Sequence, residues 1–323
     1  MRGPIIALFA AATIFAAPTR LIIDGDEGSH LIGSTETTTV TLQTTLGSKE
    51  LVLNTLREIN IDDDVSSITL TDGKRLAGKL LIDSLTISTI IGDIRVPTAH
   101  IRRVQILSGD VFNGLLLHYS FDADKGERIE DSVGDAHARA KGSSVLAEGR
   151  LGAARQFSGE PQHIVLPEAT VSGMREGSIA TWIRLPKTSN QQIFNRCVEE
   201  EDIHVQFRTG DRGNLAAFLG PYATSISVRS QETIPANTWT HIALTWNGSE
   251  ADLYQNGKRV AHLEDPEERL LVPLIHGSFW IGRDTRKAYP GQTLRGDLDE
   301  FMVFRRTLFE LDIQSLFAYY TKK

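Results

Sequence analysis

The residues with the clearest capacity for chemistry are the acids of the segment GDLDEFMVF, residues 296–304. Successive side chains of a β-strand point to opposite faces, so this segment predicts Asp297, Asp299 and Phe301 on one face and Glu300 on the other. Two carboxyl groups can act as nucleophile and general acid on a glycosidic bond when they flank it about 5–5.5 Å apart. Carboxylate oxygens are also the ligands that calcium prefers. The segment therefore raises two hypotheses, glycoside hydrolysis and calcium binding.

Aromatic side chains offer a second kind of chemistry, because the C–H faces of sugars stack on electron-rich rings. Tyr222 (in LGPYATS) and Tyr289 (in KAYPGQ) lie in loops bounded by Gly and Pro. Binding residues concentrate on loops, so we expect these two tyrosines to contact a ligand; the alternative is that each is an ordinary surface residue. The tryptophans are further candidates: Trp182, Trp239, Trp246 and Trp280.

Charge and cysteine content exclude several classes of protein. The net charge of −7 and the pI of 5.7 argue against a nucleic-acid partner, which needs a basic surface. Cys197 is the single cysteine, so the chain forms no internal disulfide and no cysteine-rich metal site. Patterns of a Ser-His-Asp triad, of a phosphate-binding glycine loop and of zinc-ligand spacing are absent from the sequence.

The N-terminus has the features of a secretory signal peptide. Arg2 is followed by the apolar run IIALFAAATIFAA, residues 5–17, which is typical of a signal peptide over residues 1–19. A membrane span needs about 20 apolar residues, so this run is short for one, although an uncleaved membrane anchor is the alternative. We expect a secreted or periplasmic protein, or one of the cell envelope, with no membrane contact beyond the signal segment.

The first third of the chain predicts a small β module. Residues 20–37 are polar and glycine-rich, and we interpret them as a linker or an edge strand. Residues 38–108 are rich in Thr, Ile, Leu and Val, which favours about six strands. They contain an internal repeat of about 45 residues, in which residues 40–47 align with residues 85–92. The segment SGDVFN, residues 108–113, is the expected domain boundary.

The last two thirds predict antiparallel β structure. Residues 240–246 alternate, with Ile242, Leu244 and Trp246 on one face. The dipeptide Asn256-Gly257 follows, which is typical of a type I′ hairpin turn because both central residues of that turn need positive φ. The segment is therefore a hairpin in an antiparallel sheet.

Six sequence blocks in the region 114–321 resemble one family in their order along the chain. This region is similar to the laminin-G-like, concanavalin-A-like lectin/glucanase domains. The resemblance implies an all-β fold, a two-sheet antiparallel jelly-roll sandwich, with Trp182 and Trp246 in the sandwich core. The blocks are LHYSFD (117–122), ARQFSG (154–159), SIATWIRL (178–185), WTHIA followed by LYQNG (239–243 and 253–257), GDLDEFMVF (296–304) and a short terminal helix (308–316).

The resemblance also implies where calcium would bind. In these domains the closing strand runs near the opening strand, and relatives often hold a structural calcium ion. The alternative is that Asp131 and Asp299 form turn or backbone hydrogen bonds, or pair with an arginine such as Arg184 or Arg283. The predicted ligands of a structural Ca²⁺ are Asp122, Asp131, Asp297 and Asp299.

The family includes β-glucanases, which place three acids at alternating positions of one strand. Here only Asp297 and Asp299 alternate, and Glu300 is expected on the other face, so the hydrolase pattern is incomplete. We therefore expect a non-catalytic binding or adhesion protein that recognises a glycan or a cell-surface protein. A polysaccharide-active glycoside hydrolase is the first alternative, and a structural component of the cell envelope is the second.

Overall fold

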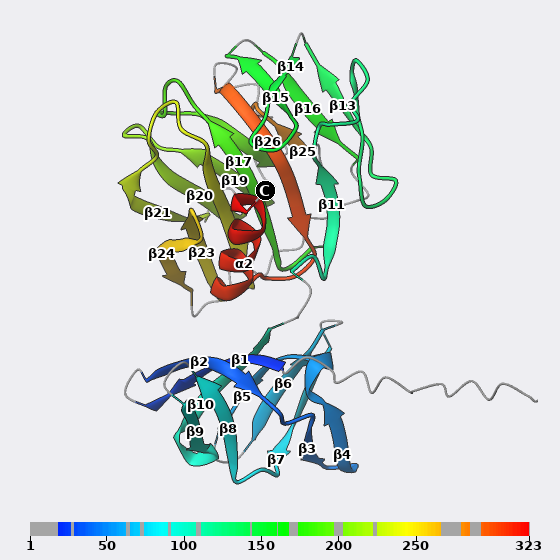
Figure 1. Cartoon of the computed structure of the whole chain (residues 1–323), viewed down its shortest axis with the longest axis vertical. Coiled ribbons are helices and arrows are strands. Elements are labelled where there is room, and N and C mark those ends of the chain that lie inside the picture. Colours follow the sequence, from blue (N-terminus) through cyan, green and yellow to red (C-terminus); the bar gives the residue numbers. More distant parts are fainter. Residues whose placement is uncertain are drawn as a thin grey trace, which may run out of the picture. The chain divides into compact units, whose positions relative to one another are not determined.

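The chain forms two compact units, Met1–Asp110 and Val111–Lys323 (Figure 1). The computed structural model describes residues 19–26, 29–62, 65–71, 74–89, 92–107, 111–142, 144–159, 161–167, 174–196, 203–221, 225–265, 279–284 and 292–322. The expected signal peptide up to residue 18 lies outside this part of the chain, as do Cys197, Tyr222 and Tyr289. None of the described helices is both long and apolar enough to cross a membrane.

The first unit is a single antiparallel sheet in its described residues, with the strand order β4-β3-β7-β6-β5-β10-β1-β2-β8-β9. Residues 20–37, interpreted as a linker or an edge strand, form β1 and β2, and β1 lies inside the sheet between β10 and β2. The strands are β1 (Thr19–Gly25), β2 (His30–Thr35), β3 (Thr39–Thr44), β4 (Gly47–Val52), β5 (Leu56–Asn60), β6 (Ser66–Leu70), β7 (Arg75–Leu80), β8 (Ser84–Thr89), β9 (Gly92–Pro97) and β10 (Ile101–Leu107).

The two copies of the sequence repeat fold in the same way. Each is a hairpin (β3–β4 and β8–β9), a 3₁₀ turn (Leu53–Thr55 and Thr98–His100) and a further strand (β5 and β10). The hairpin turns place Gly47 and Gly92 at φ of 117° and 116°, a conformation that favours glycine. The described residues between 38 and 108 form eight strands, more than the six expected, because β6 and β7 add two strands between the three strands of each repeat copy.

The second unit is a sandwich of two antiparallel sheets, so the predicted all-β fold is confirmed. The β26 sheet has the order β14-β15-β26-β17-β22-β23-β24, with β11 also paired to β26, and the β18 sheet has the order β12-β13-β16-β25-β18-β19-β20-β21. The strands of the β26 sheet are β11 (Leu115–Tyr119), β14 (Val145–Glu148), β15 (Ala153–Ser158), β17 (Gly177–Arg184), β22 (Thr240–Trp246), β23 (Glu250–Gln255), β24 (Lys258–Glu264) and β26 (Arg295–Phe304). Those of the β18 sheet are β12 (Arg128–Ile129), β13 (Ala138–Lys141), β16 (His163–Leu166), β18 (Gln192–Arg196), β19 (Ile203–Thr209), β20 (Asn214–Pro221), β21 (Ile226–Thr233) and β25 (Phe279–Ile281).

The sandwich core lies between the two sheets and is filled by alternating apolar side chains of both. The prediction that Ile242, Leu244 and Trp246 of β22 share one face is confirmed, and the structure shows that this face is buried in the core. They pack in the same cluster as Phe194 and Phe207 of the β18 sheet. A core of this kind positions every outward side chain, because each neighbour along a strand must face away from it.

A second apolar layer lies between the β26 sheet and the helix α2 (Glu310–Thr321), which Figure 1 shows in red in front of that sheet. Leu316 and Tyr320 of the helix pack on Met302 of β26 and on Trp182 of β17. The expectation that Trp182 fills the sandwich core is therefore wrong. Its neighbour Ile183 takes the core position, and alternation turns Trp182 toward the helix.

Candidate functional site

The acidic strand β26 carries a β-bulge that changes the direction of its side chains. Glu300 has a φ of 50°, and the pairing of β26 with β17 shifts register next to it. Leu298 and Phe301, three positions apart, consequently both face the sandwich core. The expected alternation, which placed Phe301 on the face of Asp297 and Asp299, is wrong here because a bulge adds one residue to the strand.

The bulge brings Glu300 to the opening strand, where its carboxylate forms an ion pair with Nε2 of His118. Leu117 and Tyr119, on either side of His118, lie in the sandwich core, so this pair lies on the outer face of the β26 sheet. Ser132 Oγ lies 2.8 Å from Nδ1 of the same imidazole. The structure thus contains a hydrogen-bonded chain from Ser132 through His118 to Glu300 that no sequence pattern indicated.

The carboxylate of Asp131 organises the turn that follows the opening strand. Its Oδ1 accepts hydrogen bonds from the backbone N–H groups of His118 (3.0 Å) and Val133 (3.1 Å). Its Oδ2 accepts from the N–H groups of Gly134 and Ala136, both at 3.1 Å. These four donors are engaged by Asp131 and are not available to stabilise an oxyanion. At this turn, the hydrogen-bonded series Ser132–His118–Glu300 therefore has none of these four backbone donors free beside it to form an oxyanion hole.

Two more of the predicted calcium ligands accept hydrogen bonds from the backbone. Asp122 Oδ1 accepts from the N–H of Ala153 at 2.7 Å. Asp299 is fully buried, and its Oδ2 accepts from the N–H groups of Arg150 (2.7 Å) and Leu151 (3.1 Å). Burial raises the pKa of the Asp299 carboxyl to about 7, although the N–H of Leu151 opposes that rise. The carboxylate oxygens of Asp122 and Asp299 are thus used to accept hydrogen bonds from backbone N–H groups at the turn between β14 and β15.

The fourth predicted ligand, Asp297, forms an ion pair with Arg184 at 2.8 Å. The structure therefore does not gather the four aspartates into one ligand set. In the described residues, a group of side chains with ligand atoms within 4.8 Å of one another is formed instead by Glu250, His262 and Glu264, on the hairpin β23–β24.

The outer face of the β18 sheet carries a polar and aromatic surface. Val205 and Phe207 lie in the sandwich core, so Gln206 between them faces outward. The pairing register then aligns four side chains across β25, β18, β19 and β20. They are Trp280, Asn195, Gln206 and Phe218, and we call this row the Trp280–Phe218 face.

The two aromatic rings of this face are partly exposed and lie three strand spacings apart, about 14 Å. The imidazole of His163 packs on Trp280 with the ring centroids 4.3 Å apart. Burial lowers the pKa of His163, so this imidazole is neutral near neutral pH. The guanidinium groups of Arg229 and Arg208 lie 4.9 Å and 6.0 Å from the centre of the Phe218 ring. Both rings are therefore held by neighbours in fixed orientations.

Between the rings lie polar groups that are themselves fixed by hydrogen bonds. Gln206 Nε2 donates to Oε1 of Gln192 (3.3 Å) and to Oδ2 of Asp284 (3.1 Å). Asn195, Gln206 and Asp284 are 0, 3 and 1% exposed. These three polar groups are buried, so the surface that this face offers to a ligand is that of its two partly exposed rings, which suit apolar C–H faces.

Sequence reasoning identified part of this face. Trp280 was among the aromatic candidates, whereas Asn195, Gln206, Asp284 and Phe218 were missed. The alternation of residues 205–208 (VQFR) is a signal that Gln206 faces outward. Which residues of distant strands lie beside it depends on strand order and register. The predicted ligand residues Tyr222 and Tyr289 lie outside the described residues.

Comparison with known proteins supports the fold of the second unit. Residues 158–314 match the family described as the concanavalin A-like lectin/glucanases superfamily, which confirms the resemblance. Domain 4 of an extracellular GH43 arabinanase from Geobacillus stearothermophilus, solved in complex with arabinotriose, is similar with a TM-score of 0.53 and 21% identity. The likeness covers 62% of this chain and 97% of that one. No curated protein sequence matches the chain.

Toxin binding domains have a similar fold. The binding domain of Paraclostridial Mosquitocidal Protein 1 has a TM-score of 0.53 and 18% identity over 65% of this chain and 53% of that one. The binding domain of botulinum neurotoxin DC, solved in complex with rat synaptotagmin II, has a TM-score of 0.50 and 16% identity over 65% and 52%. This chain thus covers about half of those toxin domains, and at such identities the likeness shows the fold alone.

Proposed function

Since residues 158–314 carry a domain of the concanavalin A-like lectin/glucanase superfamily, we propose that the protein is a non-catalytic glycan-binding protein, secreted or attached to the cell envelope. The observation that carries the proposal is the Trp280–Phe218 face, where two partly exposed rings flank Asn195 and Gln206. Sugar rings stack their C–H faces on such aromatic rings, and the buried polar groups between the rings hold the strands that carry them.

The acids of β26 support the non-catalytic half of the proposal. A glycosidase needs two carboxyl groups open to the substrate on either side of the scissile bond. Asp299 and Glu300 are 0% and 1% exposed, and each is bonded to protein groups. Asp297 is neutralised by Arg184. None of the three is free to protonate a leaving group or to attack a sugar.

The test is a glycan array with the full chain, followed by calorimetry with each glycan that binds. We expect Trp280→Ala and Phe218→Ala each to weaken binding about tenfold, which corresponds to about 1.4 kcal/mol. Tyr319→Ala is the control, since Tyr319 is an exposed aromatic residue of the helix α2. An array without a binding glycan, or ring variants that bind as well as the control, would overturn the proposal. Release of reducing sugar that Asp299→Asn abolishes would support a hydrolase instead.

A further inference from the structure

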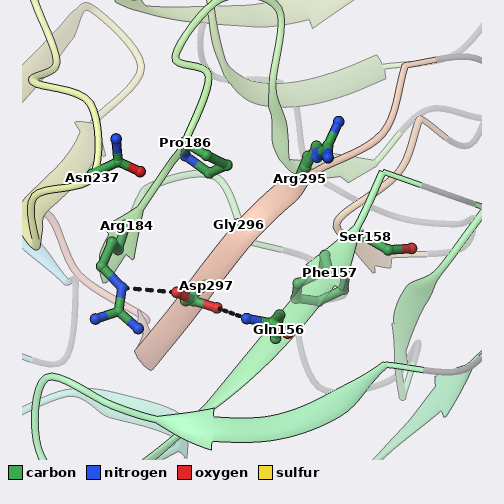
Figure 2. A pocket seen from close by; sticks show the side chains of 9 residues that line it. All are labelled: Gln156, Phe157, Ser158, Arg184, Pro186, Asn237, Arg295, Gly296 and Asp297. Atoms are coloured by element: carbon green, nitrogen blue, oxygen red, sulfur yellow. Dashed lines mark hydrogen bonds and ion pairs between the residues drawn. The ribbon is translucent and has the colours of Figure 1, made fainter.

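A groove on the side of the β26 sheet has a volume of about 360 Å³, within the usual size range of small-molecule sites (Figure 2). It is lined by the start of β26, the end of β17, part of β15 and the turn before β22. The polar side chains that matter for its chemistry are Gln156, Ser158, Arg184, Asn237, Arg295 and Asp297. None of them belongs to the Trp280–Phe218 face, so the groove is a separate candidate site.

The inner part of the groove is a fully paired network centred on Asp297. Its Oδ2 accepts from Arg184 Nε at 2.8 Å, and its Oδ1 accepts from Gln156 Nε2 at 3.0 Å (Figure 2). Arg184 also donates from Nη2 to the carbonyl of Glu148 (3.3 Å), and its guanidinium lies 4.9 Å from the centre of the Trp239 ring. The charges of Asp297 and Arg184 therefore compensate each other, and their side chains are held before any ligand arrives.

The guanidinium of Arg295 is a positive charge at the groove that no carboxylate of the described residues pairs with. Its side chain is exposed, and among the described residues its guanidinium has no hydrogen-bond or ion-pair partner. The position of its backbone is fixed, because its N–H donates to Gln191 Oε1 at 2.7 Å. Its aliphatic stem lies against Gly159, where a β-carbon would approach within 3.3 Å. The guanidinium is thus presented to the groove by a well-supported stem.

Asn237 faces Arg295 from the turn before β22. Figure 2 shows the two side chains on opposite sides of the groove, with Pro186 between them and with Asp297 and Gln156 lower in the view. Asn237 has a φ of 55°, and its N–H donates to the carbonyl of Leu185 at 2.8 Å, which fixes the turn. Its amide group offers both a donor and an acceptor to a bound hydroxyl group.

We propose that this groove binds a sugar that carries a carboxylate, that is, a uronate residue of an acidic glycan. The planar guanidinium of Arg295 matches a carboxylate with two parallel hydrogen bonds, and the net charge of the groove is positive once Asp297 and Arg184 are paired. The amides of Asn237 and Gln156 suit the ring hydroxyl groups. The volume accommodates a small polar ligand of about one sugar ring.

The proposal is tested by calorimetry on the full chain with tetragalacturonate and with the neutral galactose tetramer as probes. We expect tetragalacturonate to bind at least tenfold more tightly than the neutral tetramer, and its affinity to fall as salt concentration rises. Equal affinity for the two probes, or no binding of tetragalacturonate, would overturn the assignment.

Variants separate the roles of the groove residues. Arg295→Gln removes the charge from an exposed side chain and should weaken tetragalacturonate binding at least tenfold, whereas Arg295→Lys should weaken it less, because lysine keeps the charge but loses the paired hydrogen bonds. Asn237→Gly removes the amide at a φ that glycine tolerates and should weaken binding severalfold. Arg305→Gln, at another exposed arginine, is the control. Wild-type affinity of Arg295→Gln would refute the proposal.

Binding of tetragalacturonate at the groove is expected to be independent of glycan binding at the Trp280–Phe218 face. Trp280→Ala should leave tetragalacturonate binding at the groove unchanged, while Arg295→Gln should leave binding at the Trp280–Phe218 face unchanged. If Trp280→Ala abolished tetragalacturonate binding and Arg295→Gln did not, the uronate would bind at the other face and the groove assignment would be wrong.

Discussion

Glu300 of the closing strand forms an ion pair with His118 of the opening strand, and this contact joins the two strands on the outer face of the β26 sheet. The side chain of Glu300 is 2% exposed and that of His118 is 16% exposed, so the pair is shielded from water. A buried charge that loses its partner costs far more than the pair itself contributes.

Removing one member of this pair should therefore destabilise the second unit strongly. We expect His118→Leu to lower the free energy of unfolding by about 3 kcal/mol, because the buried Glu300 loses its ion-pair partner and, among the described residues, keeps only its hydrogen bond with Tyr320. The double variant His118→Leu/Glu300→Met should recover most of that loss. Intrinsic tryptophan fluorescence during urea unfolding reports on this unit alone, because all four tryptophans lie in it. A loss in the double variant equal to the sum of the losses of His118→Leu and Glu300→Met alone would contradict the coupling.

Asp131 should be the most sensitive residue of the turn after the opening strand. Its carboxylate accepts four backbone hydrogen bonds, so Asp131→Ala leaves four N–H groups without their acceptor. We expect a loss of about 3 kcal/mol in the free energy of unfolding. Asp131→Asn should lose less, because one of its two side-chain atoms still accepts. A value for Asp131→Ala within experimental error of wild type would show that water replaces the carboxylate.

His241 should make the second unit sensitive to acid. The imidazole is fully buried between Trp182 and Phe317, and burial lowers its pKa to about 3. The unfolded chain binds a proton at this residue below about pH 6.5 while the folded state does not, so stability is present above that pH and is lost as the pH falls toward 3.

The variant His241→Phe removes this titration and keeps a ring of similar size. It should unfold at a higher urea concentration than wild type at about pH 5, by about 2 kcal/mol, and the advantage should vanish at about pH 8. An advantage of the same size at both pH values would mean that the gain comes from packing and not from the proton.

Calcium binding by Asp122, Asp131, Asp297 and Asp299 is a prediction that thermal unfolding can test directly. A bound ion stabilises the folded state by RT ln(1 + [L]/Kd), about 2.7 kcal/mol at a hundredfold excess over Kd. Because the four carboxylates accept hydrogen bonds from protein groups and do not share one cluster, we expect the same midpoint in millimolar calcium and in chelator. A higher midpoint in calcium would restore the ion as a structural cofactor.

The fold was predictable from sequence because it depends on local patterns. The alternation of β22 placed Ile242, Leu244 and Trp246 on one face, and in the structure all three side chains share the sandwich core. Both copies of the repeat in the first unit were visible as aligned hairpins with glycine turns. Such features follow from neighbours along the chain, where the period of two and the turn residues act within a few positions.

The direction of the acids on β26 was not predictable in the same way. Strict alternation placed Phe301 on the same face as Asp297 and Asp299, but a single residue in the left-handed region, Glu300, resets the period for the rest of the strand. The ion pair with His118 joins residues 182 positions apart in the chain. Nothing near Glu300 in the sequence marks the bulge. A bulge is defined by two residues of one strand facing one residue of the neighbouring strand, and here that neighbour is β17, which is distant in the sequence.

The sequence by itself determined two β modules and an antiparallel sandwich in the second. Tertiary structure alone decided which outward residues share a surface. Strand order and register align Trp280 with Phe218 and bring Arg295 opposite Asn237, and they bury Asp299 beneath a turn. The physical reason is that alternation sets only the face on which a side chain lies, whereas its neighbours on that face come from strands far away in the chain.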